Sequence, residues 1–266
     1  MKRAGIGNNS GEGFMDTSTT SWQKVSKWYG EAVGKEGHYY HQHVILPQSL
    51  RLLALKEDSS LLDLACGQGV LARQIPKEVQ YEGIDAAPGL IKQAKQLDKN
   101  KRHVYLVADV SQKLPVQKSD FSHAAIILSL QNIKNPEGVI KNAQRHLGKG
   151  GKLLMVLNHP CFRIPRQTSW ETDEQNKMQY RRVNRYLSPL EIPVRSNPGK
   201  GEASEVVWSY HLPLSEYSRM LSESGFVIEK LEEWTSDKSS VGSAAKMENR
   251  ARSEFPLFLA ILARKD

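Results

Sequence analysis

A turn with two glycines after an apolar run is where residue types and spacing first indicate chemistry. Residues 61–73 read LLDLACGQGVLAR. Gly67, Gly69 and Ala72 fit the spacing G-x-G-x-x-A, which brings a backbone turn against a nucleotide pyrophosphate. Asp63 argues against that ligand, because a pyrophosphate gains nothing from a carboxylate aimed at it. Two ligands therefore stay open, a dinucleotide or a smaller nucleotide whose near end is cationic.

Two more acidic residues close the next strand-like runs. Asp85 ends the run 80–85, and Asp109 follows the run 103–108. Ligands of open parallel sheets bind outside the carboxyl ends of the strands, so both carboxylates are predicted beside the glycine turn. A carboxylate at the end of the second strand can accept hydrogen bonds from both ribose hydroxyls, and Asp109 offers an acceptor to an adenine amino group.

The central part of the chain alternates between strand-like and helical patterns. The strand-like runs are 60–66, 80–85, 103–108, 121–128 and 152–157, and the helical patterns between them are 69–75, 87–97 and 136–147. A helix at 215–226 and two strands, 226–232 and 257–263, follow. This alternation predicts an α/β fold with a mostly parallel sheet of seven strands flanked by helices.

Composition narrows the function classes. The 266 residues suffice for one large α/β domain. No apolar run reaches the length of a membrane span, and the first residues lack the apolar stretch of a secretory signal, which predicts a cytoplasmic protein without membrane association. Cys66 and Cys161 make neither a disulfide framework nor a metal-ligand spacing, so no metal site is predicted.

The ends and the middle of the chain depart from the alternating pattern. Residues 1–20 are mostly small and polar and are predicted to be a disordered leader, which leaves 21–266 as the domain. Residues 21–56 read as helical, with aromatic residues along one stripe. The alternation fails over about 158–210, which is predicted to be an insertion with short strands such as EVVWSYH.

The formal net charge of +8 raises the question of nucleic acid. The densest basic run, 92–102, contains no aromatic residue of the kind that stacks on bases, and a solvated surface explains it better. The segment 179–186, QYRRVNRY, does alternate tyrosine with arginine. An RNA substrate therefore stays open as an alternative.

Five motifs taken together resemble one enzyme family. They are LLDLACGQG, YEGIDAAPGLIKQAK, ADVSQKLP, FSHAAIILSLQNI and NAQRHLGKGGKLLMV. Their order and spacing strongly resemble class I S-adenosylmethionine-dependent methyltransferases, over roughly 45–160 and the last helix and strand pair. The resemblance implies a Rossmann-like fold, S-adenosylmethionine as cosubstrate and methyl transfer as the activity. It favours the methyl donor over a dinucleotide, with Ala65 standing where the family often carries its first glycine.

The resemblance also implies a donor site at the carboxyl ends of the strands, made of Asp63, Ala65, Gly67, Gly69, Asp85, Ala86, Asp109, Val110 and Leu128. Asp85 holds the ribose hydroxyls in this interpretation, and Asp109 with the amide of Val110 reads the adenine edge. The family's lid often comes from an N-terminal aromatic helix, so residues 21–56 are predicted to form a lid in which Tyr29 faces the sulfonium. Packing within the helical stripe is an equal alternative for Tyr29.

The segment after the fifth strand, LNHPCFRIPR, is predicted to face the methyl acceptor. His159 is the first candidate for a general base toward a hydroxyl, because a neutral imidazole accepts a proton near neutral pH. A structural hydrogen bond at the turn is the alternative for His159. Pro160-Cys161 resembles a cytosine-methylating thiol motif, but in the wrong place along the chain. Arg163 is a candidate to bind an acidic group of the acceptor.

The C-terminal pattern resembles type 11 methyltransferases of small molecules, in which the preceding insertion caps the acceptor pocket. We therefore expect residues 158–210 to form a cap, with a substrate pocket that includes Asn158, Arg163, Trp170 and Trp208. The predicted acceptor is a small hydrophobic or aromatic metabolite, methylated at oxygen, nitrogen or carbon. The alternatives are RNA, bound through Arg181, Arg182 and Arg185, and a non-catalytic S-adenosylmethionine-binding protein. The expected state is a monomer or homodimer.

Overall fold

The computed structural model describes residues 21–197, 199 and 203–266, so the predicted leader lies outside the described residues. One sheet contains seven strands: β1 (Ser60–Leu64), β2 (Gln80–Asp85), β3 (Val104–Val107), β4 (Phe121–Ile127), β5 (Leu147–Asn158), β10 (Phe226–Trp234) and β11 (Phe258–Lys265). Their order is β10-β11-β5-β4-β1-β2-β3. The strands from β3 to β5 are parallel neighbours, whereas β11 runs antiparallel to both β5 and β10. The predicted Rossmann-like sheet is confirmed.

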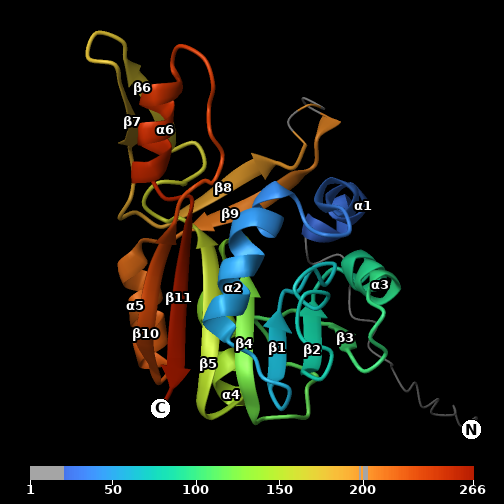
Figure 1. Cartoon of the computed structure of the whole chain (residues 1–266). Coiled ribbons are helices and arrows are strands. Elements are labelled where there is room, and N and C mark those ends of the chain that lie inside the picture. The colour runs from blue at the N-terminus through green and yellow to red at the C-terminus, as the bar shows by residue number, and fades with distance from the viewer. Residues whose placement is uncertain (1–20, 198, 200–202) are drawn as a thin grey trace, which may run out of the picture.

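Helices cover both faces of this sheet (Figure 1). On one face lie a π-helical turn, η1 (His41–Ile45), with α2 (Leu46–Leu53) and α3 (Pro88–Leu97); on the other lie α4 (Pro136–His146) and α5 (Leu214–Glu223). Every residue of β1 is buried, as expected for a central strand covered on both faces. The helix α1 (Ser21–Val33) packs against α3, beside the carboxyl end of the sheet.

The helix predicted at 69–75 is absent, and a series of turns takes its place. Gly67 and Gly69 adopt left-handed backbone angles, with φ of 57° and 71°, which do not continue into a right-handed helix. The Arg73 side chain donates to the carbonyl oxygens of Gln68 (2.6 Å) and Gly69 (2.9 Å), for which the helix would have supplied backbone N–H donors. The periodic apolar spacing of this stretch therefore reflects burial without a helix.

The segment between β5 and α5 forms two hairpins. The first pairs β6 (Thr168–Asp173) with β7 (Met178–Val183), and the second pairs β8 (Leu190–Arg195) with β9 (Val206–His211). The strand β9 contacts α1 and the short 3-10 helix η2 (Leu130–Asn132) at the carboxyl end of the sheet, whereas β7 contacts α6 (Ala245–Glu254). In Figure 1 the β6–β7 hairpin and α6 project together from the body.

Candidate active site

A cavity of about 740 Å³ lies at the carboxyl end of the parallel strands. Of the residues predicted for the donor, those on its wall are Asp63, Ala65, Gly67, Asp85, Ala86, Asp109, Val110, Leu128 and Tyr29. Gly69 is not on the wall. A Cβ at Gly69 would lie 2.8 Å from the Tyr105 hydroxyl, so this glycine is required by close packing beneath the turn.

Asp85 ties the glycine turn to the end of β2. Its Oδ2 accepts a hydrogen bond from the Gly67 N–H and its Oδ1 accepts one from the Ala87 N–H, both at 2.9 Å. Gly67 lines the cavity and a Cβ there would have no atom within 4 Å, so a side chain would project into the cavity. Ala65 has a φ of 60°, a left-handed conformation that costs a residue with a Cβ about 1–2 kcal/mol.

Asp63 is a buried carboxyl group without a positively charged partner among the described residues. It is 3% exposed, and its Oδ2 accepts a hydrogen bond of 2.7 Å from the Tyr81 hydroxyl. Burial raises the pKa of Asp63 to about 7, against the opposing effect of that hydrogen bond, and the charge of Asp85 raises it further. The site therefore fits a cationic group better than a pyrophosphate.

Tyr29 reaches the cavity from α1 and lies near Asp85. Burial, together with the charge of Asp85, raises the pKa of Tyr29 to about 12, so its hydroxyl stays protonated. The rings of Trp22 and Tyr29 pack edge to face with centroids 5.2 Å apart. Gln23 accepts a hydrogen bond of 3.0 Å from the Gly89 N–H, which docks α1 on the start of α3. Tyr29 therefore packs and lines the wall at once, and the lid remains a prediction.

The predicted adenine end is more open. Asp109 is exposed, and its Oδ1 accepts hydrogen bonds of 2.8 Å from the N–H and from the hydroxyl of Ser111. These bonds hold the turn after β3, and the second carboxylate oxygen makes no hydrogen bond to a described residue. Leu128, at the end of β4, has a φ of 53°, an unusual conformation for a leucine that bends the chain along the cavity wall.

The opposite wall of the cavity comes from the β8–β9 hairpin. Val206, Trp208 and Tyr210 alternate along β9 and line the cavity, and Trp208 is the predicted pocket residue that the structure places there. Lys134 lines the cavity too, and its Nζ lies 3.0 Å from Glu191 Oε1 on β8. The hairpin is thereby held to the chain that follows β4.

His159, predicted as a general base, does not line the cavity. It is 1% exposed, its Nε2 lies 2.7 Å from Glu233 Oε1, and its Nδ1 accepts a hydrogen bond of 3.2 Å from the Cys161 N–H. Burial lowers the pKa of His159. Both ring nitrogens are engaged within the protein, so the structural alternative fits His159 and the catalytic one does not.

The predicted pocket residues Asn158, Arg163 and Trp170 also lie away from the cavity wall. Asn158 pairs with Phe258 at the end of β5, and the Arg163 guanidinium lies 5.3 Å from the ring centre of Phe258. Trp170 packs edge to face on Phe255, just after α6, with centroids 5.4 Å apart. Asn158 and Arg163 are directed by their packing against β11, whereas Trp170 follows the β6–β7 hairpin, which packs on α6, a helix that sequence periodicity did not predict.

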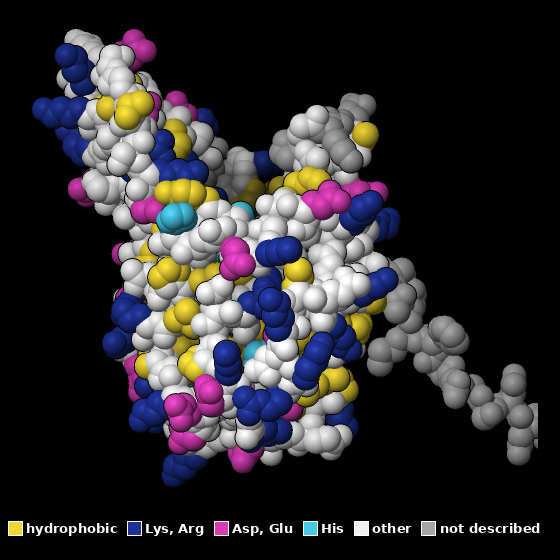
Figure 2. Space-filling model, turned by 45° about the vertical axis from the view of Figure 1, so that its right-hand side comes forward, with side chains coloured by type: hydrophobic (Ala, Val, Ile, Leu, Met, Phe, Trp, Pro, Cys, Tyr) yellow, Lys and Arg dark blue, Asp and Glu magenta, His cyan; other side chains and the backbone are white. Residues whose placement is uncertain are grey.

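The arginine cluster behind the RNA alternative lies on and after β7. Arg181 donates hydrogen bonds to the Phe162 carbonyl (2.7 Å) and the Thr168 hydroxyl (2.8 Å). Arg182 Nη1 lies 3.8 Å from Glu171 Oε1. Figure 2 shows lysine and arginine side chains spread over the visible face of both the body and the projecting part. Arg181 and Arg182 therefore have roles within the hairpin.

Several wall residues were not singled out by sequence reasoning. They include Gln68, Ser111, Gln112, Asn132 and Lys134. Gln68 is 2% exposed despite its polarity, and its place between Gly67 and Gly69 was the available signal. Burial lowers the pKa of His41 to about 3, so its imidazole is neutral at ordinary pH.

Two other features concern the described residues as a whole. Nowhere in residues 21–197, 199 and 203–266 do three His, Cys, Asp or Glu side chains gather as a group able to hold a metal ion. In the same ranges, every helix is too short or too polar to cross a membrane.

Comparison with known proteins assigns the core of the chain. Residues 62–155 match the family model of a methyltransferase domain. This part of the chain is a methyltransferase domain. The matched range contains all of β2, β3 and β4 and most of β1 and β5, and the match confirms the resemblance to S-adenosylmethionine-dependent methyltransferases.

The individual proteins that match this chain are also methyltransferases. An uncharacterized methyltransferase of Schizosaccharomyces pombe is 32% identical over 40% of this chain and 42% of its own length. A ubiquinone biosynthesis O-methyltransferase of Xanthomonas oryzae is 28% identical over 42% of this chain and 50% of its own. The matched part of the chain thus spans half or less of the length of each of these two relatives. A solved S-adenosylmethionine-dependent methyltransferase of Mesorhizobium loti shares the fold, with a TM-score of 0.62, 23% identity, and coverage of 82% of this chain and 96% of its own.

Proposed function

We propose that this protein transfers the methyl group of S-adenosylmethionine to a small hydrophobic or aromatic molecule. The observation that carries the proposal is one continuous cavity with two unlike walls. Asp63, Asp85 and the glycine turn form one wall, and Trp208 with Tyr210 on β9 form the other. Its volume of about 740 Å³ lies within the range of small-molecule sites, so donor and acceptor can share it.

The donor wall suits each part of the donor. Asp85, at the end of β2, would hold the ribose hydroxyls, and the exposed oxygen of Asp109 with the Val110 amide would meet the adenine edge. Asp63, a buried carboxyl group without a cation, would attract the ammonium of the methionine part. Gly67 leaves the space that the ligand needs, because no protein atom lies within 4 Å of its missing Cβ.

The acceptor is proposed to lie between β9 and the chain that follows β4. Trp208 is 40% exposed and lines the cavity, which makes it a surface for an aromatic or apolar partner. Oxygen and carbon are both candidate methylation sites, since the matched relatives include an O-methyltransferase and a C-methyltransferase. A pocket of this kind fits a free metabolite better than an RNA strand.

Catalysis would rest mainly on alignment. S-adenosylmethionine supplies a methyl group that is already activated on its sulfonium. The contribution of the chain is to hold acceptor and donor in line and to exclude water, through the strand ends on one side and α1 with β9 on the other. His41 on the cavity wall is neutral, because burial lowers its pKa to about 3, and it adds no competing positive charge beside the donor.

Parallel calorimetric titrations with S-adenosylmethionine, S-adenosylhomocysteine and NADH test the donor. We expect micromolar binding of the two sulfur compounds and none of NADH. A metabolite pool is then screened for a mass gain of one methyl group, with RNA as a second substrate at two salt concentrations. NADH binding would overturn the donor assignment, and donor binding without any methyl transfer would favour a non-catalytic binding protein.

A further inference from the structure

The end of α1 is tied to the glycine turn by side chains of the turn segment. After Val33 the helix ends at Gly34, whose φ of 67° turns the chain away. The carbonyl of Gly34 accepts a hydrogen bond of 2.7 Å from Gln68 Nε2. The carbonyl of Lys35 accepts two from Arg73, from Nε at 3.1 Å and from Nη2 at 2.6 Å.

The same Arg73 guanidinium also holds the turn. Its Nη1 donates to the carbonyls of Gln68 (2.6 Å) and Gly69 (2.9 Å). All three side-chain nitrogens of Arg73 therefore bind backbone carbonyls, one of them just past the C-terminus of α1, where a cation is favoured by the helix dipole. A planar fork with five N–H groups is needed for these contacts, and a lysine ammonium does not reproduce that geometry.

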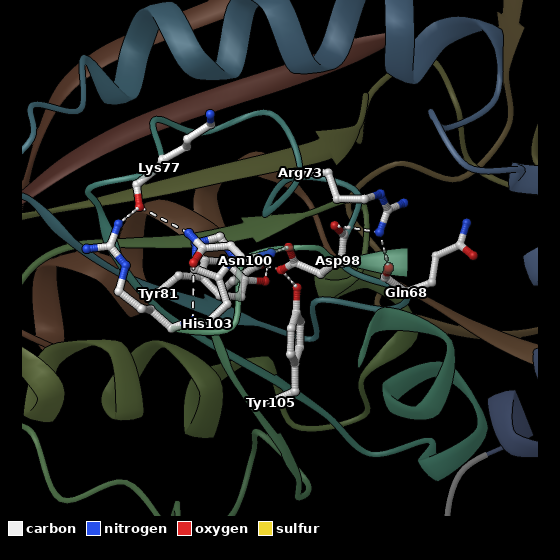
Figure 3. Close-up of polar contacts among 11 residues, drawn as sticks. Gln68, Arg73, Lys77, Tyr81, Asp98, Asn100, His103 and Tyr105 are labelled. Carbon is white, nitrogen blue, oxygen red and sulfur yellow. Dashed lines mark hydrogen bonds and ion pairs between the residues drawn. The ribbon is translucent and has the colours of Figure 1, made fainter. Parts of the chain in front are cut away.

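A buried cluster supports the turn from the other side (Figure 3). The Tyr105 hydroxyl, packed beneath Gly69, donates a hydrogen bond of 2.6 Å to Asp98 Oδ2. The same Asp98 oxygen lies 2.7 Å from His103 Nδ1, and both side chains are almost fully buried. The turn is therefore fixed from below, and Arg73 and Gln68 connect it to the backbone that follows α1.

That connection joins two parts of the cavity wall. Gln68 lies in the turn and lines the cavity, while α1 contributes Trp22 and Tyr29 to the same cavity. Among the described residues, no other side chain of 65–75 donates a hydrogen bond to the 34–35 backbone, and Gln74 Nε2 donates one of 3.2 Å to Glu36 Oε2 on the next residue. A shift of the turn on donor binding would therefore be felt first at the end of α1.

We propose that Arg73 is a positioning residue that couples the donor turn to α1, so that an occupied donor site sets α1 against the acceptor. The inference rests on the proposed function, because the ligand of the turn is taken to be the methyl donor. Arg73 touches neither ligand in this proposal. It acts through the carbonyls of Gly69 and Lys35, and the acceptor side of the cavity is completed only once the donor has bound.

Hydrogen exchange at saturating S-adenosylhomocysteine tests the coupling without depending on the acceptor. In the wild type, the ligand is expected to slow amide exchange both in residues 66–75 and in α1. In Arg73→Lys, with enough ligand to saturate the site, the slowing in 66–75 persists and that in α1 is reduced, because only the hydrogen bond from Gln68 to the Gly34 carbonyl still joins the turn to the 34–35 backbone. Donor affinity falls about fivefold to tenfold, the scale of one or two lost hydrogen bonds.

Arg102→Lys is the matched control. Arg102 also donates to a backbone carbonyl, that of Lys77 at 2.5 Å, but does not line the cavity. It is expected to keep wild-type affinity and protection of α1. A second variant, Arg73→Ala, adds a rescue test, in which guanidinium at a non-denaturing concentration restores the protection of α1.

Two results would overturn the coupling: equal protection of α1 in the wild type and Arg73→Lys at saturation, or no protection of α1 in the ligand-bound wild type. Failure of the proposed function looks different. In that case the wild type binds neither S-adenosylmethionine nor S-adenosylhomocysteine.

Discussion

The two walls of the cavity are built by different means. The donor wall consists of strand ends and turns whose buried carboxylates are held by backbone amides and by Tyr81. The opposite wall is one two-stranded hairpin, with Trp208 40% exposed and a surface pair between Lys134 and Glu191. A wall held by backbone hydrogen bonds suits a donor that is the same in every reaction. A wall made of side chains on a hairpin can change with the acceptor through substitution of those side chains.

The second hairpin sharpens this contrast. β6–β7 and β8–β9 are both antiparallel and both carry an exposed tryptophan, Trp170 and Trp208. Of these two tryptophans only Trp208 lies on the cavity wall, because the β6–β7 hairpin packs against α6, away from the cavity. Position relative to the sheet, and not composition, decides which hairpin can meet a ligand.

The largest effect is expected on the donor wall. Asp85→Ala removes the predicted partner of the ribose hydroxyls and the acceptor of the Gly67 and Ala87 amides, so donor affinity should fall by more than about tenfold. Calorimetry with S-adenosylhomocysteine measures the change, and the unfolding midpoint shows whether the variant is folded. Unchanged affinity in the folded variant would show that the donor lies elsewhere.

Donor affinity should also depend on pH through Asp63. Its pKa of about 7 in the unliganded protein means that a cationic ligand must displace a proton below that pH, so affinity rises by up to about tenfold from pH 6 to 8. The free energy of unfolding of the ligand-free protein changes in the opposite direction and falls as the pH rises. The unfolded chain loses this proton near pH 3.8 and the folded one near 7, so rising pH removes stability within that window. Asp63→Asn should flatten both profiles.

Trp208→Ala tests the hairpin wall, once an acceptor has been found. We expect a rise of about fivefold to tenfold in KM for the acceptor, from lost apolar contact, with donor affinity unchanged. Trp170→Ala, on the other hairpin, is the matched control and should leave both values unchanged. Equal effects of the two substitutions would remove the distinction between the hairpins.

The smallest effect on methyl transfer is expected at His159. His159→Ala breaks contacts to Glu233 and Cys161, so the free energy of unfolding should fall by about 1–3 kcal/mol. The rate of methyl transfer at saturating substrates should stay within about twofold of the wild type, since the ring does not line the cavity. A loss of several orders of magnitude in a folded variant would restore His159 as a base.

The parallel strands and the wall made of their carboxyl ends were predictable because both follow from local sequence and one general rule. Buried apolar runs between helices predict parallel strands, and the carboxyl ends of parallel strands meet at one edge. Asp63, Asp85 and Asp109 could therefore be placed at one cavity before any contact was known. The exception, the absent helix at 69–75, arose because left-handed glycines and the Arg73 side chain replaced the helical hydrogen bonds.

Only the tertiary structure decided where the side chains of the residues after β5 lie. His159, Arg163 and Trp170 have the right chemistry for an acceptor site, but their directions depend on what packs beside them: Glu233, Phe258 and α6. These partners lie about 70 to 95 positions away along the chain, and no local pattern encodes such contacts. The sequence by itself thus determined the sheet and its donor edge, through short-range hydrophobic patterning, whereas long-range packing decided which hairpin closes the cavity.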